Sequence, residues 1–270
     1  MSVERKLKRI TVPSIMKMKG KSPIAVLTAY DALMADILDR SGIDIILVGD
    51  SAGMVMGGAE NTLAVTIEEM LMYTRSVRRG VNHALLVADM PFLSYQVSTE
   101  QAVRNAGRFL QEAGAEAVKL EGGTPVLDTI HRIVSVGIPV MGHLGLTPQS
   151  IHQLGGYGIQ GKDKILADKL LKEALLLQEA GVFSLVLEKI PARLAKEISD
   201  SLQIPTIGIG AGKGCDGQVL VSQDMLGLYD KFKPKFVRRY AELSTEVMNA
   251  FIDYIEDVKS GKFPKEDESY

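Results

Sequence analysis

The chain has 270 residues and a formal net charge of −2, with 31 Lys and Arg against 33 Asp and Glu. The basic residues are scattered along the chain, which argues against a nucleic-acid-binding protein. A single cysteine excludes an intramolecular disulfide, and no Cys and His have the spacing of zinc ligands. No apolar run reaches the roughly 18 residues of a membrane span, and the charged N-terminus lacks the apolar core of a signal peptide. These features predict a cytoplasmic protein without membrane or nucleic-acid partners.

Eight short runs rich in β-branched and other apolar residues predict strands. They lie at 24–30, 43–50, 84–89, 117–122, 138–145, 184–190, 204–210 and 217–222. Amphipathic helical patterns alternate with them, and Thr66 with Glu69 matches a helix-starting capping box. Several runs are apolar throughout, as in parallel strands that are covered on both faces. We therefore predict an α/β fold, a (β/α)8 TIM barrel, for which this chain length is ordinary.

The sequence predicts one barrel domain over 1–270, with a short N-terminal extension (about 1–22) and a polar C-terminal tail (about 259–270). Two segments depart from the regular alternation. About half a dozen residues separate the seventh and eighth runs, too few for a crossover helix, so one barrel helix should be missing or displaced. The segment 51–65 is glycine-rich and too long for an ordinary connection, and we expect it to form a loop over the active-site end of the barrel.

Three successive predicted strands end on acidic residues: Asp50, Asp89 and Glu121. Neighbouring parallel strands lie about 4.8 Å apart, so these side chains should converge at the C-terminal end of the barrel, where barrel active sites lie. One acid in such a place is usually a helix cap or an ion-pair partner. Three together favour a metal site, because a cation offsets buried like charges. Oxygen ligands and the scarcity of histidine favour Mg²⁺, which leaves room for a chelating substrate such as an α-keto acid.

Two further polar residues belong to the same predicted end. Lys119 precedes Glu121 by two positions, so both point to the same face of the strand. It either binds a substrate carboxylate or forms a structural ion pair with Glu121. His143 is either a structural histidine or a donor to a carbonyl or alkoxide oxygen, and the following HLGLTP pattern is typical of a βα loop, which favours the second role.

Glu188 ends the apolar run SLVLE of the sixth predicted strand. A carboxylate in such surroundings suits a general base, because desolvation favours its protonated form. The alternative is an ion pair with Lys189 or Arg193, but Lys189 should alternate to the opposite face and point toward the helices. The glycine-rich segment GIGAGKGCDG (208–217) resembles an anion-binding loop or a set of tight turns, without dinucleotide or P-loop spacing.

Seven motifs follow one another along the chain: LTAYD (27–31), LVGDSAGMV (47–55), VADMPF (87–92), VKLEGG (118–123), GHLGLTPQS (142–150), LVLE (185–188) and GIGAGKGCDGQVLV (208–221). Together they resemble the ketopantoate hydroxymethyltransferase family over about residues 10–260. The resemblance implies a Mg²⁺-dependent barrel of the phosphoenolpyruvate/pyruvate superfamily. Such an enzyme transfers a one-carbon unit from the co-substrate 5,10-methylenetetrahydrofolate to the keto acid 3-methyl-2-oxobutanoate. The product, 2-dehydropantoate, leads to pantothenate and coenzyme A, and the family forms homo-oligomers, often decamers.

The resemblance also implies roles for individual residues. The metal ligands correspond to Asp50, Asp89 and Glu121, and the keto acid contacts correspond to Asp50, Ser51, Asp89 and Lys119. Glu188 corresponds to the proton acceptor that generates a Mg²⁺-stabilised enolate, while Tyr30 and His143 occupy substrate-pocket positions. Lys189 departs from the family pattern, in which a small residue often follows the glutamate.

Two other functions remain open at this point. One is a Mg²⁺-dependent C–C lyase or mutase on the same barrel, related to isocitrate lyase. Those enzymes carry a catalytic cysteine in a strand-end loop, whereas Cys215 lies between the seventh and eighth predicted strands. The other is a non-catalytic keto-acid-binding barrel, against which the complete set of acids, Lys119 and Glu188 argues.

Overall fold

The computed structural model describes residues 8–229 and 234–270. The chain divides into two compact units, Met1–Val221 and Ser222–Tyr270. The first unit holds the barrel and the second is helical. That the two form one domain, as the sequence predicts, stays a prediction.

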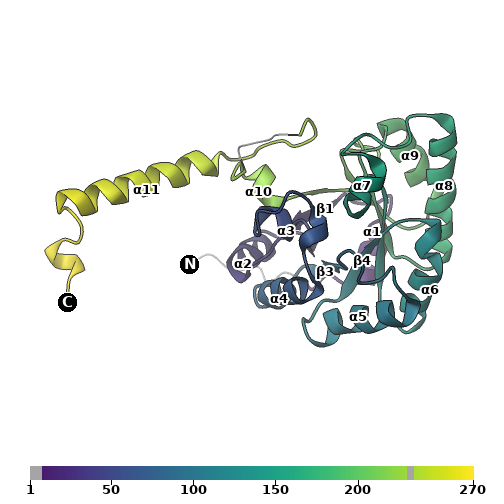
Figure 1. Cartoon of the computed structure of the whole chain (residues 1–270), viewed down its shortest axis with the longest axis horizontal. Helices are drawn as coiled ribbons and strands as arrows, with labels where there is room; N and C mark the ends of the chain where they lie inside the picture. The colour runs from purple at the N-terminus through teal and green to yellow at the C-terminus, as the bar shows by residue number, and fades with distance from the viewer. Residues whose placement is uncertain (1–7, 230–233) are drawn as a thin grey trace. The chain divides into compact units, whose positions relative to one another are not determined.

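Eight parallel strands close into a barrel in chain order, with β8 pairing back onto β1 (Figure 1). The strands are β1 (Ile24–Thr28), β2 (Ile45–Val48), β3 (Leu85–Asp89), β4 (Ala117–Glu121), β5 (Val140–Gly145), β6 (Ser184–Glu188), β7 (Thr206–Ile209) and β8 (Gly217–Leu220). Each lies within a predicted run, so the predicted TIM barrel is confirmed. The runs extend past the strand ends by one or two residues, because buried residues continue into the connections.

Helices follow the first six strands and surround the barrel (Figure 1). They are α2 (Ala32–Arg40), α4 (Ile67–Arg78), α5 (Thr99–Gln111), α6 (Leu127–Ser135), α8 (Lys164–Glu179) and α9 (Ala192–Ser201). Thr66 and Glu69 form the predicted capping box at the start of α4, where each side chain satisfies a backbone amide of the other. Residues 210–216, all described, contain no helix, so the missing crossover between β7 and β8 is confirmed.

Strand alternation separates two buried clusters. Side chains such as Ile46 point outward into the cluster that joins the strands to the helices. Their neighbours Ile45 and Leu47 point into the barrel, where they pack with residues of the other strands. Ile15 of α1 (Val12–Met18) joins this inner cluster, so the N-terminal extension contributes to the barrel core.

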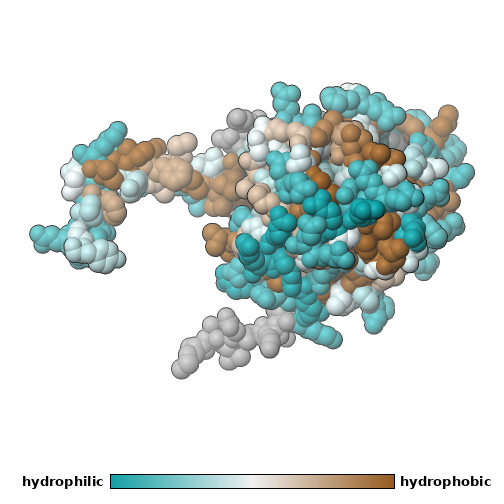
Figure 2. Space-filling model, turned by 60° about the horizontal axis from the view of Figure 1, so that its bottom comes forward, coloured by the Kyte–Doolittle hydropathy of each residue, from teal (hydrophilic) through white to brown (hydrophobic). Residues whose placement is uncertain are grey.

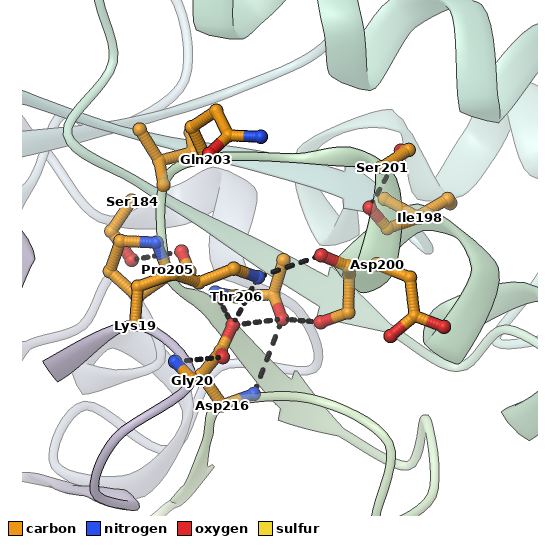
Figure 3. Close-up of polar contacts among 12 residues, drawn as sticks. Lys19, Gly20, Ser184, Ile198, Asp200, Ser201, Gln203, Pro205, Thr206 and Asp216 are labelled. Atoms are coloured by element: carbon orange, nitrogen blue, oxygen red, sulfur yellow. Dashed lines mark hydrogen bonds and ion pairs between the residues drawn. The ribbon is translucent and has the colours of Figure 1, made fainter.

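A polar cluster, formed by Lys19 and Asp216 with their partners, lies at the N-terminal end of the barrel (Figure 3). The Lys19 ammonium donates to Asp216 Oδ2 at 2.8 Å and to the Ser199 carbonyl at 2.7 Å. Asp216 also accepts from the Thr206 amide at 2.8 Å and from the Gly20 amide at 3.1 Å. The ammonium and both carboxylate oxygens therefore have hydrogen-bond partners.

The segment 51–65 lies at the opposite end of the barrel. It contains α3 (Ala52–Val55) and the 3-10 helix η1 (Thr62–Ala64), whose first turn is capped by Asn61. η1 contacts the 3-10 helix η3 (Pro148–Ser150), which follows β5. The predicted connection is thus found at the C-terminal end of the strands, and it contains two short helices of 4 and 3 residues.

Several short elements complete the chain: the 3-10 helix η2 (Thr124–Val126), α7 (Ile151–Leu154), α10 (Ser222–Met225) and the 3-10 helix η4 (Glu266–Glu268). The longest helix, α11 (Leu243–Ser260), buries none of its residues. Apolar side chains along it, among them Met248, Phe251 and Tyr254, are exposed. Figure 2 shows apolar surface beside polar surface on this helical segment. Residues 259–270 are exposed throughout. Among the described residues, no helix combines the length and apolar character needed to cross a membrane.

Candidate active site

The three predicted acids lie together at the C-terminal end of the barrel. Asp89 and Glu121 are the last residues of β3 and β4, and Asp50 follows the end of β2 by two positions. All three are buried, with exposed fractions of 3 to 6%. The Asp50 amide donates to Asp89 Oδ2 at 3.1 Å. The predicted convergence of three carboxylates is therefore present in the structure.

Gly49 permits the side chains of Ser51 and Asp89 to lie close to the backbone that follows β2. A Cβ atom at position 49 would lie 2.7 Å from Ser51 Oγ and 3.7 Å from Asp89 Oδ2. The first distance is shorter than any acceptable contact, so a larger residue would displace Ser51. Glycine at position 49 therefore allows the Ser51 side chain to lie against the backbone that follows β2 without a steric clash.

Lys119 lies among the acids, on the same strand face as Glu121. Its ammonium is 3.3 Å from Asp89 Oδ1 and 4.0 Å from Glu121 Oε1, and its side chain is 5% exposed. Burial acts to lower the pKa of Lys119, but the charges of Asp89, Glu121 and Asp50 outweigh it and raise the pKa above its ordinary value. Lys119 therefore carries a positive charge at neutral pH, and its contacts fit the ion-pair role while leaving the substrate role open.

The single ammonium leaves the cluster short of positive charge. Burial, together with the charges of Asp89 and Glu121, raises the pKa of Asp50 well above its usual range. Burial also raises the pKa of Asp89, although Lys119 opposes the shift. Asp89 Oδ1 makes an ion pair with Lys119 but has no hydrogen bond within the described residues. These features indicate a site that a further cation would stabilise.

His143 links the acid cluster to Glu188. It lies on β5 opposite Glu121, with Nδ1 3.4 Å from Glu121 Oε1 and Nε2 3.4 Å from Glu188 Oε2. Burial and the Lys119 charge act to lower the pKa of His143, but the contacts with the two carboxylates outweigh them and raise it to about 9. Lys119 Nζ also lies 3.3 Å from His143 Nδ1. The imidazole thus connects Glu188 with the buried acids.

Glu188 is the most open of these carboxylates, with a side chain that is 15% exposed. Lys189, which follows it, has a φ of 45°, a left-handed conformation that is uncommon outside glycine and ends the strand alternation. Its ammonium donates to the Tyr157 carbonyl, and its own carbonyl accepts from the Gln160 amide at 2.9 Å. Lys189 thus makes no ion pair with Glu188 in the described structure, as predicted, but it reaches the loop after β5 and not the helix layer.

Tyr30 and Ser51 form a pair beside the acids. The Tyr30 hydroxyl and Ser51 Oγ are 2.8 Å apart, and Tyr30 is 1% exposed. Burial raises the pKa of Tyr30 above its ordinary value, and the charges of Asp89 and Asp50 add to the shift. The two hydroxyl groups are therefore neutral groups beside the charged acid cluster.

Gln149 and Tyr95 also contribute to the site, although the sequence analysis assigned them no role. Gln149 Nε2 donates to Asp50 Oδ2 at 2.9 Å, and the Gln149 amide donates to Glu121 Oε2 at 3.0 Å. The Tyr95 hydroxyl lies 2.7 Å from Gln149 Oε1. The available signal was the position of Gln149 inside the GHLGLTPQS motif, but its contacts depend on how the loop after β5 folds back.

The glycine-rich segment 208–217 forms the connection between β7 and β8. Gly210 and Gly212 have φ values of 62° and 78°, as tight turns require. Cys215 lies beside Thr206, the first residue of β7, and burial raises the pKa of its thiol to about 11. The segment therefore takes the tight-turn form, and the cysteine lies toward the N-terminal end of the barrel, away from the acids.

The donor set fits a hard divalent cation, in which carboxylate oxygens share the coordination sphere with water. Excess negative charge and the Asp89 oxygen without a hydrogen bond support this fit. Within residues 8–229 and 234–270, however, no group of three His, Cys, Asp or Glu has an arrangement that would itself hold a metal ion. Lys119, His143, Gln149 and the Asp50 amide contact the carboxylate oxygens instead.

Comparison with known proteins points to one family. The model of the family described as Ketopantoate hydroxymethyltransferase matches residues 9–266. A protein named 3-methyl-2-oxobutanoate hydroxymethyltransferase, from Syntrophus aciditrophicus (strain SB), is 56% identical over 271 residues, which cover 100% of each chain.

Solved structures support the fold. Phosphoenolpyruvate phosphomutase from Streptomyces platensis subsp. rosaceus has a TM-score of 0.63 at 14% identity, covering 93% of this chain and 88% of that one. A 2,3-dimethylmalate lyase, described as a PEP mutase/isocitrate lyase superfamily member, has a TM-score of 0.59 at 16% identity, covering 96% and 90%. These likenesses confirm the barrel fold, and at such low identity they carry no information on activity.

Proposed function

The chain belongs to the ketopantoate hydroxymethyltransferase family, and we propose that it transfers a hydroxymethyl unit from 5,10-methylenetetrahydrofolate to 3-methyl-2-oxobutanoate, giving 2-dehydropantoate for pantothenate synthesis. The observation that carries this proposal is the position of His143. Its two ring nitrogens lie 3.4 Å from Glu121 and 3.4 Å from Glu188. The candidate base and the buried acid cluster thus lie on either side of one imidazole, an arrangement that suits removal of a proton next to a ketone.

Asp50, Asp89 and Glu121 would hold Mg²⁺ in this site. The bound ion would act as a Lewis acid that draws electron density from the ketone oxygen and so acidifies C3 of the keto acid. The excess of buried negative charge supports this assignment. The carboxylates must exchange some of their present hydrogen-bond partners for the ion, which suits a cation that commonly keeps several waters.

Lys119, Ser51 and Tyr30 would bind the keto acid. The buried ammonium of Lys119 offers positive charge for a carboxylate or for the developing oxygen charge, since its raised pKa keeps it protonated. Ser51 and Tyr30 add hydroxyl donors beside Asp50. His143 adds an imidazole between Glu121 and Glu188.

Glu188 would take the proton from C3. Breaking the C3–H bond transfers the proton to the Glu188 carboxylate and leaves an enolate whose charge faces Lys119 and His143. C3 then bonds to the methylene carbon of the folate, the two bonds from that carbon to N5 and N10 break, and water supplies the hydroxyl group. The proton taken from C3 and the remaining proton of the water end on the two folate nitrogens. The greater exposure of Glu188, relative to the other acids, suits a group that must reach substrate.

The position of Cys215 argues against the lyase alternative. A catalytic cysteine of that type belongs to a strand-end loop at the active site, whereas Cys215 contacts Thr206 at the start of β7. Its raised pKa also keeps the thiol protonated at neutral pH, which disfavours a reactive thiolate. The hydroxymethyltransferase reaction accounts for the site without it.

Turnover by the purified chain tests the function. The chain is incubated with Mg²⁺, 5,10-methylenetetrahydrofolate and 3-methyl-2-oxobutanoate, and 2-dehydropantoate is measured by mass spectrometry. We expect product formation that stops when a chelator removes the cation and resumes when Mg²⁺ is restored. No 2-dehydropantoate above a protein-free control would contradict the proposal.

We also propose that the protein is cytoplasmic and works as a homo-oligomer, a decamer by family resemblance. The exposed apolar side chains of α11 support association, because exposed apolar patches often mark contacts between proteins. Light scattering on the purified chain measures the mass directly, and a monomeric mass would contradict the assembly.

A further inference from the structure

We propose that Gln149 is a positioning residue, which orients the Asp50 and Glu121 carboxylates for the bound divalent cation. The inference rests on the proposed function, because it assigns Gln149 a part in the same site. Gln149 is 6% exposed and belongs to η3, in the GHLGLTPQS motif whose glutamine the mechanism above does not use.

The Gln149 side chain uses its full hydrogen-bonding capacity. Nε2 donates to Asp50 Oδ2 at 2.9 Å and to the Met90 carbonyl at 3.0 Å. Oε1 accepts from the Tyr95 hydroxyl at 2.7 Å and from Gln96 Nε2 at 3.1 Å. An amide has two donor hydrogens and two acceptor lone pairs, so all four are occupied.

These partners permit only one orientation of the amide. Rotation by 180° would turn Oε1 toward the Asp50 carboxylate and the Met90 carbonyl, both of which are acceptors. Tyr95 is itself held in place, because its hydroxyl accepts from the Glu121 amide at 3.1 Å. The direction from which Gln149 donates to Asp50 is therefore set by residues of β4 and of the loop after β3.

Gln149 also contacts a second acid through its backbone. The Gln149 amide donates to Glu121 Oε2 at 3.0 Å, on the carboxylate whose other oxygen faces His143. One residue thus binds two of the three acids, by its side chain and by its main chain. Buried carboxylates of like charge would otherwise rotate apart, and a cation site requires their oxygens to converge.

The test uses Gln149→Met, which keeps the length of the side chain and removes its polar atoms. Calorimetry with Mg²⁺ should give an affinity about 10- to 100-fold below that of the unsubstituted chain, as for other partners that orient metal ligands. At saturating Mg²⁺ the kcat should return to within a few-fold of the original, because the proposed mechanism gives Gln149 no part in the proton transfer between C3 and Glu188. Thermal unfolding is measured on the same samples.

Gln178→Met is the matched control for the loss of a structural glutamine. Gln178 Oε1 accepts from the Gln203 and Ile204 amides at 2.6 and 3.3 Å, far from the acids along the chain and on the helix layer. This variant should lower the melting temperature without changing Mg²⁺ affinity. Tyr95→Phe keeps Gln149 but removes a donor to its oxygen, and should weaken Mg²⁺ binding about 2- to 10-fold.

Unchanged Mg²⁺ affinity in Gln149→Met would overturn the positioning role, as would a kcat that saturating Mg²⁺ does not restore. If Gln149→Met does not fold, Tyr95→Phe decides: an affinity equal to that of the unsubstituted chain would overturn the inference. If the unsubstituted chain binds Mg²⁺ but produces no 2-dehydropantoate, the proposed function alone fails. If it binds no Mg²⁺, the metal assignment and the role of Gln149 fail together.

Discussion

The two ends of the barrel bury charged groups in different ways. At the N-terminal end, Lys19 faces one carboxylate, Asp216, and backbone groups complete the hydrogen bonds of both. At the C-terminal end, Lys119 faces three buried acids, and Asp89 Oδ1 and His143 Nε2 have no hydrogen bond within the described residues. A cluster whose charges are paired stabilises the folded state. A cluster with an excess of one charge is retained where a ligand supplies the opposite charge.

The direction of the pKa shifts follows the same division. Burial acts to raise the pKa of Asp216, but hydrogen bonds from Lys19 and from backbone amides outweigh it, so this pKa falls below its usual value. Burial and neighbouring acids raise the pKa of Asp50 instead. Ionised Asp216 therefore stabilises the fold, whereas ionised Asp50 is unfavourable until a cation binds.

The largest expected effect is on the candidate base. Glu188→Gln should lower C3 proton exchange of 3-methyl-2-oxobutanoate in deuterated water by about 10²- to 10⁴-fold, since a general base contributes that much. Mg²⁺ and keto-acid affinity should be retained. NMR follows the exchange, and Glu179→Gln, at an exposed position of α8, is the control. Undiminished exchange would remove Glu188 from this role.

A substitution in the acid cluster should separate activity from stability. Asp89→Asn should weaken Mg²⁺ binding by at least the roughly 10-fold seen for residues that only orient a metal ligand. Its melting temperature without cation should not fall, because the change removes a buried charge next to Asp50. Calorimetry and thermal unfolding measure the two quantities. Unchanged affinity, or a marked loss of stability, would show that this end is not organised around a cation.

The opposite result is expected at the N-terminal end. Lys19→Met removes two hydrogen bonds of a charged donor and leaves Asp216 without its cation, at a loss of about 2 kcal/mol in the free energy of unfolding. The kcat/KM should stay the same, because the cluster lies away from the acids. Urea unfolding gives the free energy, with Lys17→Met as the control, because Lys17 is an exposed lysine of α1 two positions before Lys19. A loss of activity without a loss of stability would contradict the division between the ends.

The smallest effect concerns pH. Because the pKa of Asp216 is lower in the folded chain than in the unfolded one, its contribution to stability is present above the unfolded pKa of about 3.9. It is lost as the pH falls through the folded value. Unfolding free energies of the unsubstituted chain and of Asp216→Asn should therefore differ at pH 7 and approach each other below about pH 4. A difference that does not depend on pH would contradict the ionic role of Asp216.

Much of the fold could be predicted because it depends on local patterns. Apolar runs at strand length and helical periodicity between them identified all eight strands, and the short connection before β8 showed the missing helix. The position of Asp89 and Glu121 at strand ends placed them together, since parallel strands of a barrel bring equivalent ends to one face. Lys119 and Glu121 share a face because side chains alternate along a strand.

The loops set the limit of this reasoning. Lys189 was expected to continue the alternation of β6, but its left-handed φ ends the strand and directs its ammonium to the Tyr157 carbonyl. The segment 51–65 was expected to be a loop, yet it contains α3 and η1. Neither feature follows from apolar periodicity, because hydrogen bonds to other loops determine it.

The sequence by itself determined the barrel, the strand-end acids and the family, since these depend on side-chain periodicity and on the order of short motifs. Only the tertiary structure decided which groups meet at the two ends. Gln149 reaches Asp50 across 99 positions of the chain, and Lys19 reaches Asp216 across 197. Closure of the barrel brings these residues within hydrogen-bonding distance, and no local pattern encodes a contact that arises only when the first and last strands pair.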